Sequence, residues 1–369
     1  MSGEDPTAML KSGAAWEDFC EELKGAGADL LRAESPDGSL DLVEGHRYLT
    51  RMLRAAFEQI VEAGDAAVPA FFESLHSTCK SGWDNPDNIH TNAYINAAYE
   101  YRVTGTRGDA HYLSFGVYGG SFGKKSGRRT VAYVAIDELD VAPDGTFELV
   151  LSAKPHEGNW IRLEPDATTL MVRQTFWDKS RERPAELSIE RIDSGAPPDP
   201  LDPAFFVSAL RRSLRFIRGT NAIFFPLADT WREKPNTFFR SDPERAAQTI
   251  GIPNMLYSSG WWEIEPDEAI VLDLKPPRCR YWGLVLSNYW GESLDYTTRT
   301  VHTNKERAVY ASDGSARIVV AHRDPDLPQI NWLDTAGHAS GVWTLRWLEA
   351  DDYPLPDVRV VKHADLINL

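Results

Sequence analysis

The stretch that decides the fold is ARIVVAHRDPDLPQINWLDTAGHASGVWTLRWL, residues 316–348. An earlier stretch, residues 144–173, has the same pattern: an Asp-Gly pair, an apolar run, an Asn-Trp pair and then an arginine. The offsets between the two copies are 313 − 144 = 169 for Asp-Gly, 331 − 159 = 172 for Asn-Trp and 346 − 173 = 173 for the arginine. A spacing held this closely indicates an internal duplication.

The duplication extends towards the N-terminus. HYLSFGVYGG at 111–120 pairs with RYWGLVLSNY at 280–289 by the offset 281 − 112 = 169, and EYRVTG falls opposite EAIVLDL. Each run alternates residue types and is rich in β-branched and aromatic residues, which is typical of short strands. A repeat of this length is too long for a solenoid or a propeller blade and suits a duplicated sandwich domain.

Helical spacing appears outside the two copies. Apolar residues recur every three or four positions from Trp16 to Leu30 and from Leu49 to Val61, and a third helical piece is expected over 65–78. A Pro-rich break at 194–203 precedes another helical run that begins at Pro203, and a shorter helix is expected over SDPERAAQTIG. The Gly-rich segment 119–127 is interpreted as a hairpin between strands, and the C-terminal tail as an extended segment that folds back.

These patterns predict a mainly β (α+β) fold with two related antiparallel β-sandwich units, an N-terminal helical region and a helical connector. The expected boundaries are 1–90 for the helical region, 91–195 for the first unit, 196–255 for the connector and 256–369 for the second unit.

Composition narrows the classes of partner. Acidic residues outnumber basic ones 55 to 39, for a net charge of −16, which disfavours nucleic acid and anionic membrane surfaces. The three cysteines are far apart, so no disulfide framework is expected, and the N-terminus lacks a signal-peptide pattern. We expect a cytoplasmic protein whose partner is a small-molecule ligand; the oligomeric state stays open.

Four segments resemble a known family: GWDNPDN, GNWIRLEPDATTLMVRQTFWD, YWGLVLSNYWGESLDY and DPDLPQINWLDTAGHASGVWTLRW. Together they are similar to a mainly bacterial family that carries the domain of unknown function numbered 1214, some of whose relatives also carry domain 1254. The resemblance spans roughly residues 80–360 and implies a β-sandwich architecture. It implies no reaction, so candidate residues must come from the sequence itself.

The two copies differ most just after the shared Asn-Trp pair. Because the pair is common to both, we expect it to serve the fold, with the asparagines bonding turn backbone and Trp160 and Trp332 filling the core. Only the second copy carries Asp334 and His338, which could form a carboxylate-imidazole pair for acid-base chemistry. A tight turn in which Asp334 caps backbone N–H groups fits the same residues.

A second cluster follows the strand of YWGLVLS, where Glu292, Asp295 and Tyr296 are the further catalytic candidates. Nearby carboxylates can act as acid and base only if burial separates their pKa values, and a solvated loop is the alternative. The expected ligand-binding residues are Asn331, Trp290 and Arg346.

No metal or cofactor is expected, since the chain has no HExxH, P-loop, GxSxG or helix-leading GxGxxG motif. A metal site assembled in space from His322, His338, Asp324 and Asp326 stays open. Two hypotheses of function follow. One is a hydrolase or lyase that acts by acid-base chemistry on a small organic molecule in a Trp-lined pocket, and the other is a non-catalytic binding or scaffold protein for a sugar-like or lipophilic ligand.

Overall fold

The computed structural model describes residues 5–120, 128–193, 199–242 and 252–368. The chain forms two compact units that interleave along the sequence, because short N-terminal segments belong to the second unit. Unit 1 comprises Met1–Ser35, Gly45–Cys79 and Asp87–Ala222, and unit 2 comprises Pro36–Glu44, Lys80–Pro86 and Ile223–Leu369.

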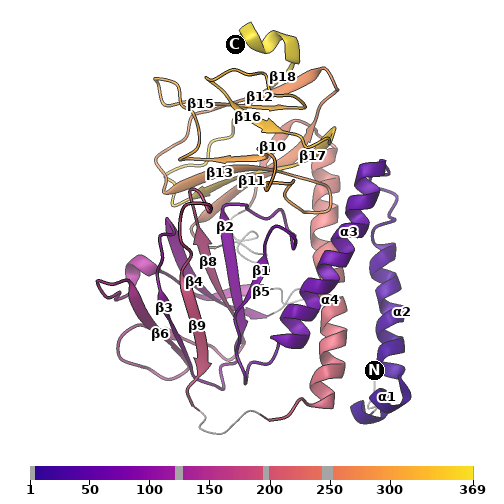
Figure 1. Ribbon diagram of the computed structural model, residues 1–369, viewed down its shortest axis with the longest axis vertical. Helices are drawn as coiled ribbons and strands as arrows, with labels where there is room; N and C mark the ends of the chain where they lie inside the picture. Colours follow the sequence, from indigo (N-terminus) through magenta and orange to yellow (C-terminus); the bar gives the residue numbers. More distant parts are fainter. Residues whose placement is uncertain (1–4, 121–127, 194–198, 243–251, 369) are drawn as a thin grey trace. The chain divides into compact units, whose positions relative to one another are not determined.

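The helices follow the expected apolar spacing. In α3, the buried residues Tyr48, Met52 and Ala55 recur at intervals of four and three, as on one helical face. A π-helical turn, η1, continues α3. The helices are α1 (Pro6–Ser12), α2 (Ala14–Ala28), α3 (Ser39–Ala56), η1 (Phe57–Glu62) and α4 (Pro203–Arg232) (Figure 1).

Two helical segments differ from their predictions. The helix expected over 65–78 is wrong, because the chain there forms turns and the strand β1 (Phe72–Leu75). The helix that begins at Pro203 is longer than its apolar pattern indicated and continues through Pro226. The short helix expected in SDPERAAQTIG and the tip of the hairpin at 119–127 lie outside the described residues.

Unit 1 consists of two sheets with the strand orders β1-β2-β8-β4-β5 and β7-β6-β3-β9. Neighbouring strands are antiparallel except β6 and β7, which are parallel. Besides β1, its strands are β2 (Asn88–Tyr94), β3 (Tyr101–Thr106), β4 (Tyr112–Gly120), β5 (Arg128–Ala135), β6 (Thr146–Ser152), β7 (Trp160–Arg162), β8 (Ala167–Thr175) and β9 (Glu186–Arg191).

Unit 2 repeats this arrangement, with the orders β10-β11-β17-β13-β14 and β16-β15-β12-β18. Again a single parallel pair, here β15 and β16, is found among its described strands. The strands are β10 (Thr237–Arg240), β11 (Met255–Glu263), β12 (Glu268–Leu274), β13 (Tyr281–Ser287), β14 (His302–Asn304), β15 (Ala316–Ala321), β16 (Asn331–Asp334), β17 (Ser340–Leu348) and β18 (Asp357–Lys362).

The predicted fold class and the duplication are confirmed. Strands β1 to β9 occupy the same places in unit 1 as β10 to β18 occupy in unit 2. Trp160 pairs with Val150 at the start of β7, and Trp332 pairs with Val319 in β16, so the two tryptophans are equivalent. The tail also folds back as predicted, because β18 pairs with β12 and η3 (His363–Asn368) follows it.

Each unit has an apolar core of alternating side chains from both of its sheets. Phe115 and Val172 lie in the unit 1 core, and Trp282, Trp343 and Trp347 lie in the unit 2 core. The ring of Trp343 stacks on Phe238, with centroids 4.4 Å apart and planes 5° apart. Most strands therefore bury one face in a core, as a sandwich requires.

The Asn-Trp pairs hold backbone, but the tryptophans are not the core plugs that we expected. Asn331 accepts from Val309 N at 2.7 Å and donates to the carbonyls of Val309 and Arg317, and Asn159 makes three equivalent bonds. Trp160 and Trp332 are half-buried, and each indole N–H donates to a carbonyl of the neighbouring strand. The indole N–H needs that acceptor, which keeps the ring at the sheet edge.

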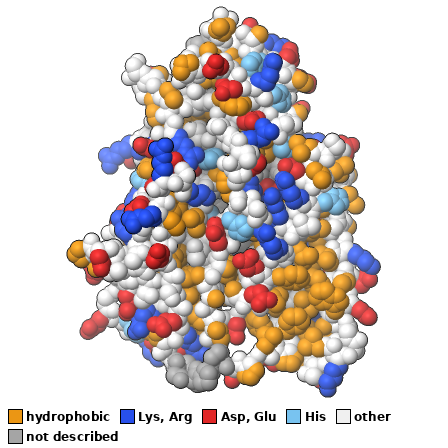
Figure 2. All heavy atoms as spheres, in the orientation of Figure 1, with side chains coloured by type: hydrophobic (Ala, Val, Ile, Leu, Met, Phe, Trp, Pro, Cys, Tyr) orange, Lys and Arg blue, Asp and Glu red, His pale blue; other side chains and the backbone are white. Residues whose placement is uncertain are grey.

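The surface carries both signs of charge. Figure 2 shows acidic and basic side chains interspersed over the face that it draws. In the described part of the chain, no helix has both the length and the apolar character needed to span a lipid bilayer.

We predict that Asn159→Ala and Asn331→Ala each lower the free energy of unfolding by about 1 to 2 kcal/mol, because each removes three partly exposed hydrogen bonds to backbone. Urea denaturation measures this. Asn254→Ala, at an exposed position, is the control, and equal stability of all three variants would contradict the shared role of the pair.

Candidate functional site

The loop from Asn288 to Tyr296, which the sequence marked as an acidic cluster, is largely buried in unit 2. Trp290 and Glu292 are each 1% exposed, whereas Asp295 is exposed at the loop's far end. A backbone that leaves a sheet and stays buried needs hydrogen-bond partners for its polar groups. The segment Lys80–Pro86 supplies many of them.

Lys80 and Asp84 are the anchors. The buried ammonium group of Lys80 donates to the carbonyls of Ser293 and Leu294 at 2.8 and 2.9 Å. Asp84 accepts from the backbone N and the hydroxyl of Ser293, both at 2.8 Å. The family-like segments GWDNPDN and YWGLVLSNYWGESLDY are therefore two sides of one hydrogen-bonded structure.

Aromatic side chains fix the other end of the loop. The indole N–H of Trp290 donates to the carbonyl of Asp41 at 2.8 Å, and the Tyr289 hydroxyl donates to Asp229 at 2.8 Å. Both rings pack edge-on against each other, and Trp290 also packs edge-on against Phe225. Trp290, which we expected to bind ligand, is thus part of the packed interior.

The imidazole of His338 is paired with a carboxylate that the sequence analysis missed. His338 Nε2 lies 2.8 Å from Oε2 of Glu44, and both side chains are buried. The amide of Asn288 donates to the same Glu44 oxygen at 2.9 Å and to Glu292 Oε2 at 3.3 Å. His338, Glu44, Asn288 and Glu292 form what we call the imidazole-carboxylate cluster.

Hydrogen bonding determines the state of this ring. His338 Nδ1 faces the carbonyl oxygen of Thr335 at 3.1 Å, and since a carbonyl only accepts, Nδ1 carries a proton. Burial opposes the charged form of His338, but the hydrogen bond and charge of Glu44, helped by Asp41, prevail and raise its pKa. Both ring nitrogens are occupied, so neither is open to a substrate.

Asp41 is influenced by the same buried charges as His338. Burial, the largest influence, raises the pKa of this carboxyl, and the charge of Glu44 acts in the same direction against the opposing charge of His338. A cluster that shifts pKa values by burial and charge is where functional residues are commonly found, although structural ion pairs produce the same shifts.

Asp334 and His338 are not brought together. Asp334 accepts from Ala336 N at 2.8 Å and from Arg299 Nη1 at 2.7 Å, so it caps its own turn and pairs with a different cation. The turn has two consecutive left-handed residues, Ala336 at φ 54° and Gly337 at φ 88°. Left-handed backbone is costly for alanine, so the turn holds strain while it directs His338 towards Glu44.

The remaining acidic candidate, Asp295, serves as a cap. Its oxygens accept from the hydroxyls of Thr297 and Thr298 and from Thr297 N, and these bonds lower its pKa to about 2. A carboxyl with so low a pKa is ionised at neutral pH and is a poor proton donor or acceptor there.

Two predicted residues, Tyr296 and Asn331, line a pocket of unit 2 with a volume of about 360 Å³. The lining brings two guanidinium groups and an imidazole next to aromatic and hydroxyl-bearing side chains. Its described lining residues are Tyr296, Arg299, Thr300, His302, Thr303, Arg307, Asn331 and Trp332. We call this the Arg-His pocket.

Inside the Arg-His pocket, Arg307 Nη1 lies 2.9 Å from His302 Nε2. Arginine only donates, so Nε2 of His302 accepts and the ring proton sits on Nδ1. The Tyr296 ring lies edge-on to His302 at 6.3 Å, with the Lys80 ammonium group 4.4 Å from its centroid. The pocket is rich in positive charge.

Arg346 lies elsewhere. Its guanidinium is buried in unit 2, where Nη2 donates to the carbonyl of Trp83, and it lies over the Tyr257 ring at 5.8 Å. His322 bonds the Thr335 hydroxyl through Nδ1 at 2.8 Å. Among the described residues, no three His, Cys, Asp or Glu side chains come together as ligands for a metal ion.

A sequence signal for Glu44 did exist. Glu44 precedes Tyr48 by four residues and Met52 by eight, so a carboxylate occupies the apolar face of α3. A buried charge on a helix face requires a partner, but the sequence does not show that the partner is almost 300 residues away.

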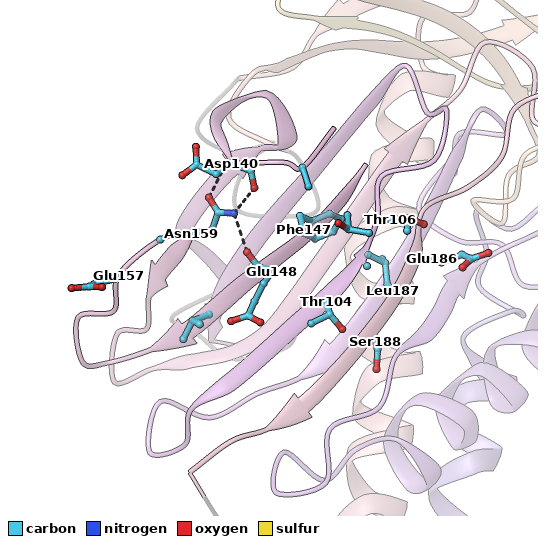
Figure 3. A pocket seen from close by; sticks show the side chains of 15 residues that line it. Thr104, Thr106, Asp140, Phe147, Glu148, Glu157, Asn159, Glu186, Leu187 and Ser188 are labelled. Atoms are coloured by element: carbon cyan, nitrogen blue, oxygen red, sulfur yellow. Dashed lines mark hydrogen bonds between the residues drawn. The ribbon is translucent and has the colours of Figure 1, made fainter. Parts of the chain in front are cut away.

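Unit 1 carries an open groove of about 860 Å³ on the sheet β7-β6-β3-β9. Figure 3 shows Thr104, Thr106 and Ser188 along its strands, with Glu148 and Asp140 near Asn159. The dashed bonds in Figure 3 join Asn159 to backbone, so this residue serves the fold. None of the predicted site residues lies in the groove.

The fold and the sites define a class: a duplicated β-sandwich protein whose second unit carries a buried ion-pair cluster and a cationic pocket. The family model described as "Protein of unknown function (DUF1214)" matches residues 88–175 and 266–352. The chain belongs to this family.

Two solved structures are similar to the chain. A putative uncharacterized protein from Burkholderia cenocepacia is 42% identical, covers 97% of this chain and 99% of its own, and has a TM-score of 0.93. The VPA0106 protein from Vibrio parahaemolyticus is 11% identical, covers 86% and 98%, and has a TM-score of 0.49. None of the curated proteins compared with the chain matches it.

The first prediction for this site concerns pH. The folded-state pKa of His338 is raised above its ordinary 6.5, so its stabilising contribution is complete below that pH and is lost as pH rises through the raised value. We expect His338→Gln to lower the free energy of unfolding by about 3 to 5 kcal/mol near pH 6, since it breaks a buried pair, and by less at higher pH. Urea denaturation across this range measures both curves; parallel curves would contradict the charged pair.

The second prediction concerns the strained turn. Ala336→Gly should raise the free energy of unfolding by about 1 kcal/mol, because glycine adopts the left-handed conformation without the cost that alanine bears. Gly337→Ala is the matched control and should lower stability, because an alanine there would have to adopt the left-handed φ. Steric overlap would not contribute, since the nearest atom, Cδ2 of Leu40, would lie 3.9 Å from the added Cβ. Thermal melts measure both variants. If the two melting temperatures shift in the same direction, the turn is not strained at Ala336.

Proposed function

We propose that the protein binds a small organic anion in the Arg-His pocket of unit 2. The observation that carries the proposal is the convergence of Arg299, His302 and Arg307 on one pocket beside the rings of Tyr296 and Trp332. Guanidinium groups bind carboxylate in a two-pronged geometry that lysine does not offer. Aromatic walls with a few placed polar groups are typical of small-molecule pockets, and the volume lies in their usual range.

Charge within the pocket supports a ligand with a single compact anionic group. Asp334 neutralises one cation, Arg299, at 2.7 Å, and the Arg299 side chain is 49% exposed. Arg307 is oriented by its bond to His302. Thr300 and Thr303 add hydroxyl groups and Asn331 contributes a side chain already committed to backbone. A ligand carboxylate would therefore meet two guanidinium groups in the lining of the pocket.

The geometry supports binding better than acid-base catalysis at His338. Both nitrogens of His338 are hydrogen-bonded and its ring is 6% exposed, so a substrate has no access to a ring lone pair. The imidazole-carboxylate cluster instead stabilises the loop that leads to Tyr296. We infer a non-catalytic binding protein, and we place it in the cytoplasm because its three cysteines are free thiols, which suit a reducing compartment.

The test is ligand-induced stabilisation of the full chain, with malonate, benzoate and inorganic phosphate as probes. We expect a carboxylate to raise the melting temperature, and Arg307→Gln to abolish the effect, because loss of a hydrogen bond to a charged group costs about 1.5 to 3 kcal/mol. Arg323→Gln, at an exposed position away from the pocket, is the control and should bind as the parent does.

Product analysis after incubation of the same probes with the protein separates the alternatives. We expect every probe to be recovered unchanged, whereas an enzyme that depends on His338 would convert a probe, and His338→Gln would lose that turnover with binding intact. Failure of every probe to stabilise the parent protein, or unchanged binding by Arg307→Gln, would contradict the proposal.

A further inference from the structure

The sheet β1-β2-β8-β4-β5 of unit 1 has one apolar and one polar face, and both are buried. Leu113, Phe115 and Val172 point into the apolar core. Residues of the opposite parity form rows across β2, β8 and β4, as the register shows: Asn88 with Thr175 and Tyr112, His90 with Arg173 and Ser114, and Asn92 with Met171 and Gly116. We call this face the polar layer.

Several hydrogen-bonding atoms of the polar layer are buried without a partner. They are Asn88 Oδ1, Asn92 Oδ1, Tyr118 Oη and Thr175 Oγ1, and each of these residues is at most 7% exposed. Buried polar atoms are nearly always satisfied in folded proteins, and each exception costs about 1 to 3 kcal/mol. These four atoms on one face of one sheet are free to hydrogen-bond a ligand.

Two cationic side chains lie in the same layer. Arg173 Nε contacts His90 Nε2 at 2.9 Å, and the guanidinium of Arg128 lies 4.1 Å from the Tyr118 ring centroid. Both arginines are buried, at 4% and 8% exposure. Burial, the largest influence, lowers the pKa of Arg128, and the charge of Arg173 acts in the same direction, so the two guanidinium groups are close enough to repel.

Gly116 makes room for the layer. A Cβ at Gly116 would lie 2.8 Å from the Tyr118 hydroxyl, so this ring leans across the glycine towards the rows that hold Arg173 and Asn92. The Tyr112 hydroxyl is hydrogen-bonded to the Tyr133 hydroxyl, so two further tyrosine rings lie beside the same rows.

Unit 2 shows what the equivalent arginine binds. Arg346 stands on β17 where Arg173 stands on β8, paired with Gly283 of β13 as Arg173 is paired with Ser114 of β4. Arg346 donates to a carbonyl oxygen, that of Trp83, which comes from outside the sheet. An oxygen acceptor above this face is therefore the kind of group that the duplicated fold places against its arginine.

We propose that the polar layer of unit 1 is a second binding site, distinct from the Arg-His pocket, for a small organic carboxylate that also carries a hydroxyl group. Arg128 and Arg173 hold the carboxylate. The amide oxygens of Asn88 and Asn92 can only accept, so each requires a donor, and the one hydrogen of a ligand hydroxyl supplies it to one of them. The Thr175 hydroxyl completes the set, and tyrosine rings line the ligand's carbon skeleton.

The test compares matched acids on the full-length protein by melting temperature and calorimetry: L-malate with succinate, and 3-hydroxybutyrate with butyrate. At least one hydroxylated acid should stabilise the protein and bind about ten- to a hundredfold more tightly than its partner without the hydroxyl, because the latter leaves the amide oxygen that the hydroxyl would reach without a donor. Arg173→Gln should lose this binding, while Arg307→Gln should keep it, which separates this site from the pocket of unit 2.

A conservative variant guards against misfolding of Arg173→Gln. Thr175→Val keeps the side-chain shape, so without ligand its melting temperature should equal or exceed the parent's, while its affinity for the hydroxylated acid falls. Thr168→Val on the same strand is the control: its hydroxyl already donates to the carbonyls of Tyr118 and Gly120, so its melting temperature should fall. The proposal is overturned if no hydroxylated acid binds, if both acids of every pair bind equally, or if Thr175→Val melts below the parent without ligand.

Discussion

A buried ammonium group, that of Lys80, is the interaction on which unit 2 depends. It donates to the carbonyls of Ser293 and Leu294, and Asp84 accepts from the backbone N–H of Ser293. The backbone polar groups of a loop that leaves the sheet thus find hydrogen-bond partners away from water. That loop carries Asn288 and Glu292 to the imidazole-carboxylate cluster and Tyr296 to the Arg-His pocket. Without the anchor, those polar side chains would have no fixed positions, because charged groups are buried only when their partners are held in place.

The fold could be predicted from the sequence because both copies place apolar residues at the same strand positions to fill a sandwich core. Both faces of β4 and β13 are buried, but only residues of one parity enter the apolar core of each unit. The offset of 169 to 173 residues repeats that alternation in the second unit. The segment 65–78 shows where such reasoning fails. Phe71, Phe72 and Leu75 have a spacing that fits a helix, yet β1 is only four residues long and has an irregular register against β2. A run this short does not distinguish the 3.6-residue period of a helix from the two-residue period of a strand.

The candidate site was harder to predict, because closeness in sequence is a poor guide to contact across a turn. Asp334 and His338 are four residues apart, but two left-handed residues lie between them, and the aspartate is occupied by Ala336 N and Arg299. The true partner of His338, Glu44, belongs to a helix at the other end of the chain. The loop of Glu292 and Tyr296 was identified by its cluster of acidic residues. Its burial was not predicted, since that depends on Lys80 and Asp84.

The two units share one fold but carry different side chains on the sheet face that lies opposite the apolar core. At equivalent rows, unit 1 has His90, Arg173 and Ser114, and unit 2 has Tyr257, Arg346 and Gly283. In unit 2 the arginine donates to the carbonyl of Trp83, whose ring packs against Phe224 and Trp231. In unit 1 the same face keeps hydroxyl and amide groups whose hydrogen bonds the fold does not complete. Unpartnered polar atoms occur on this face of unit 2 as well, at Trp261 Nε1 and Ser287 Oγ. The two copies therefore differ in the side chains that surround the equivalent arginine, not in whether every polar atom of the face has a partner.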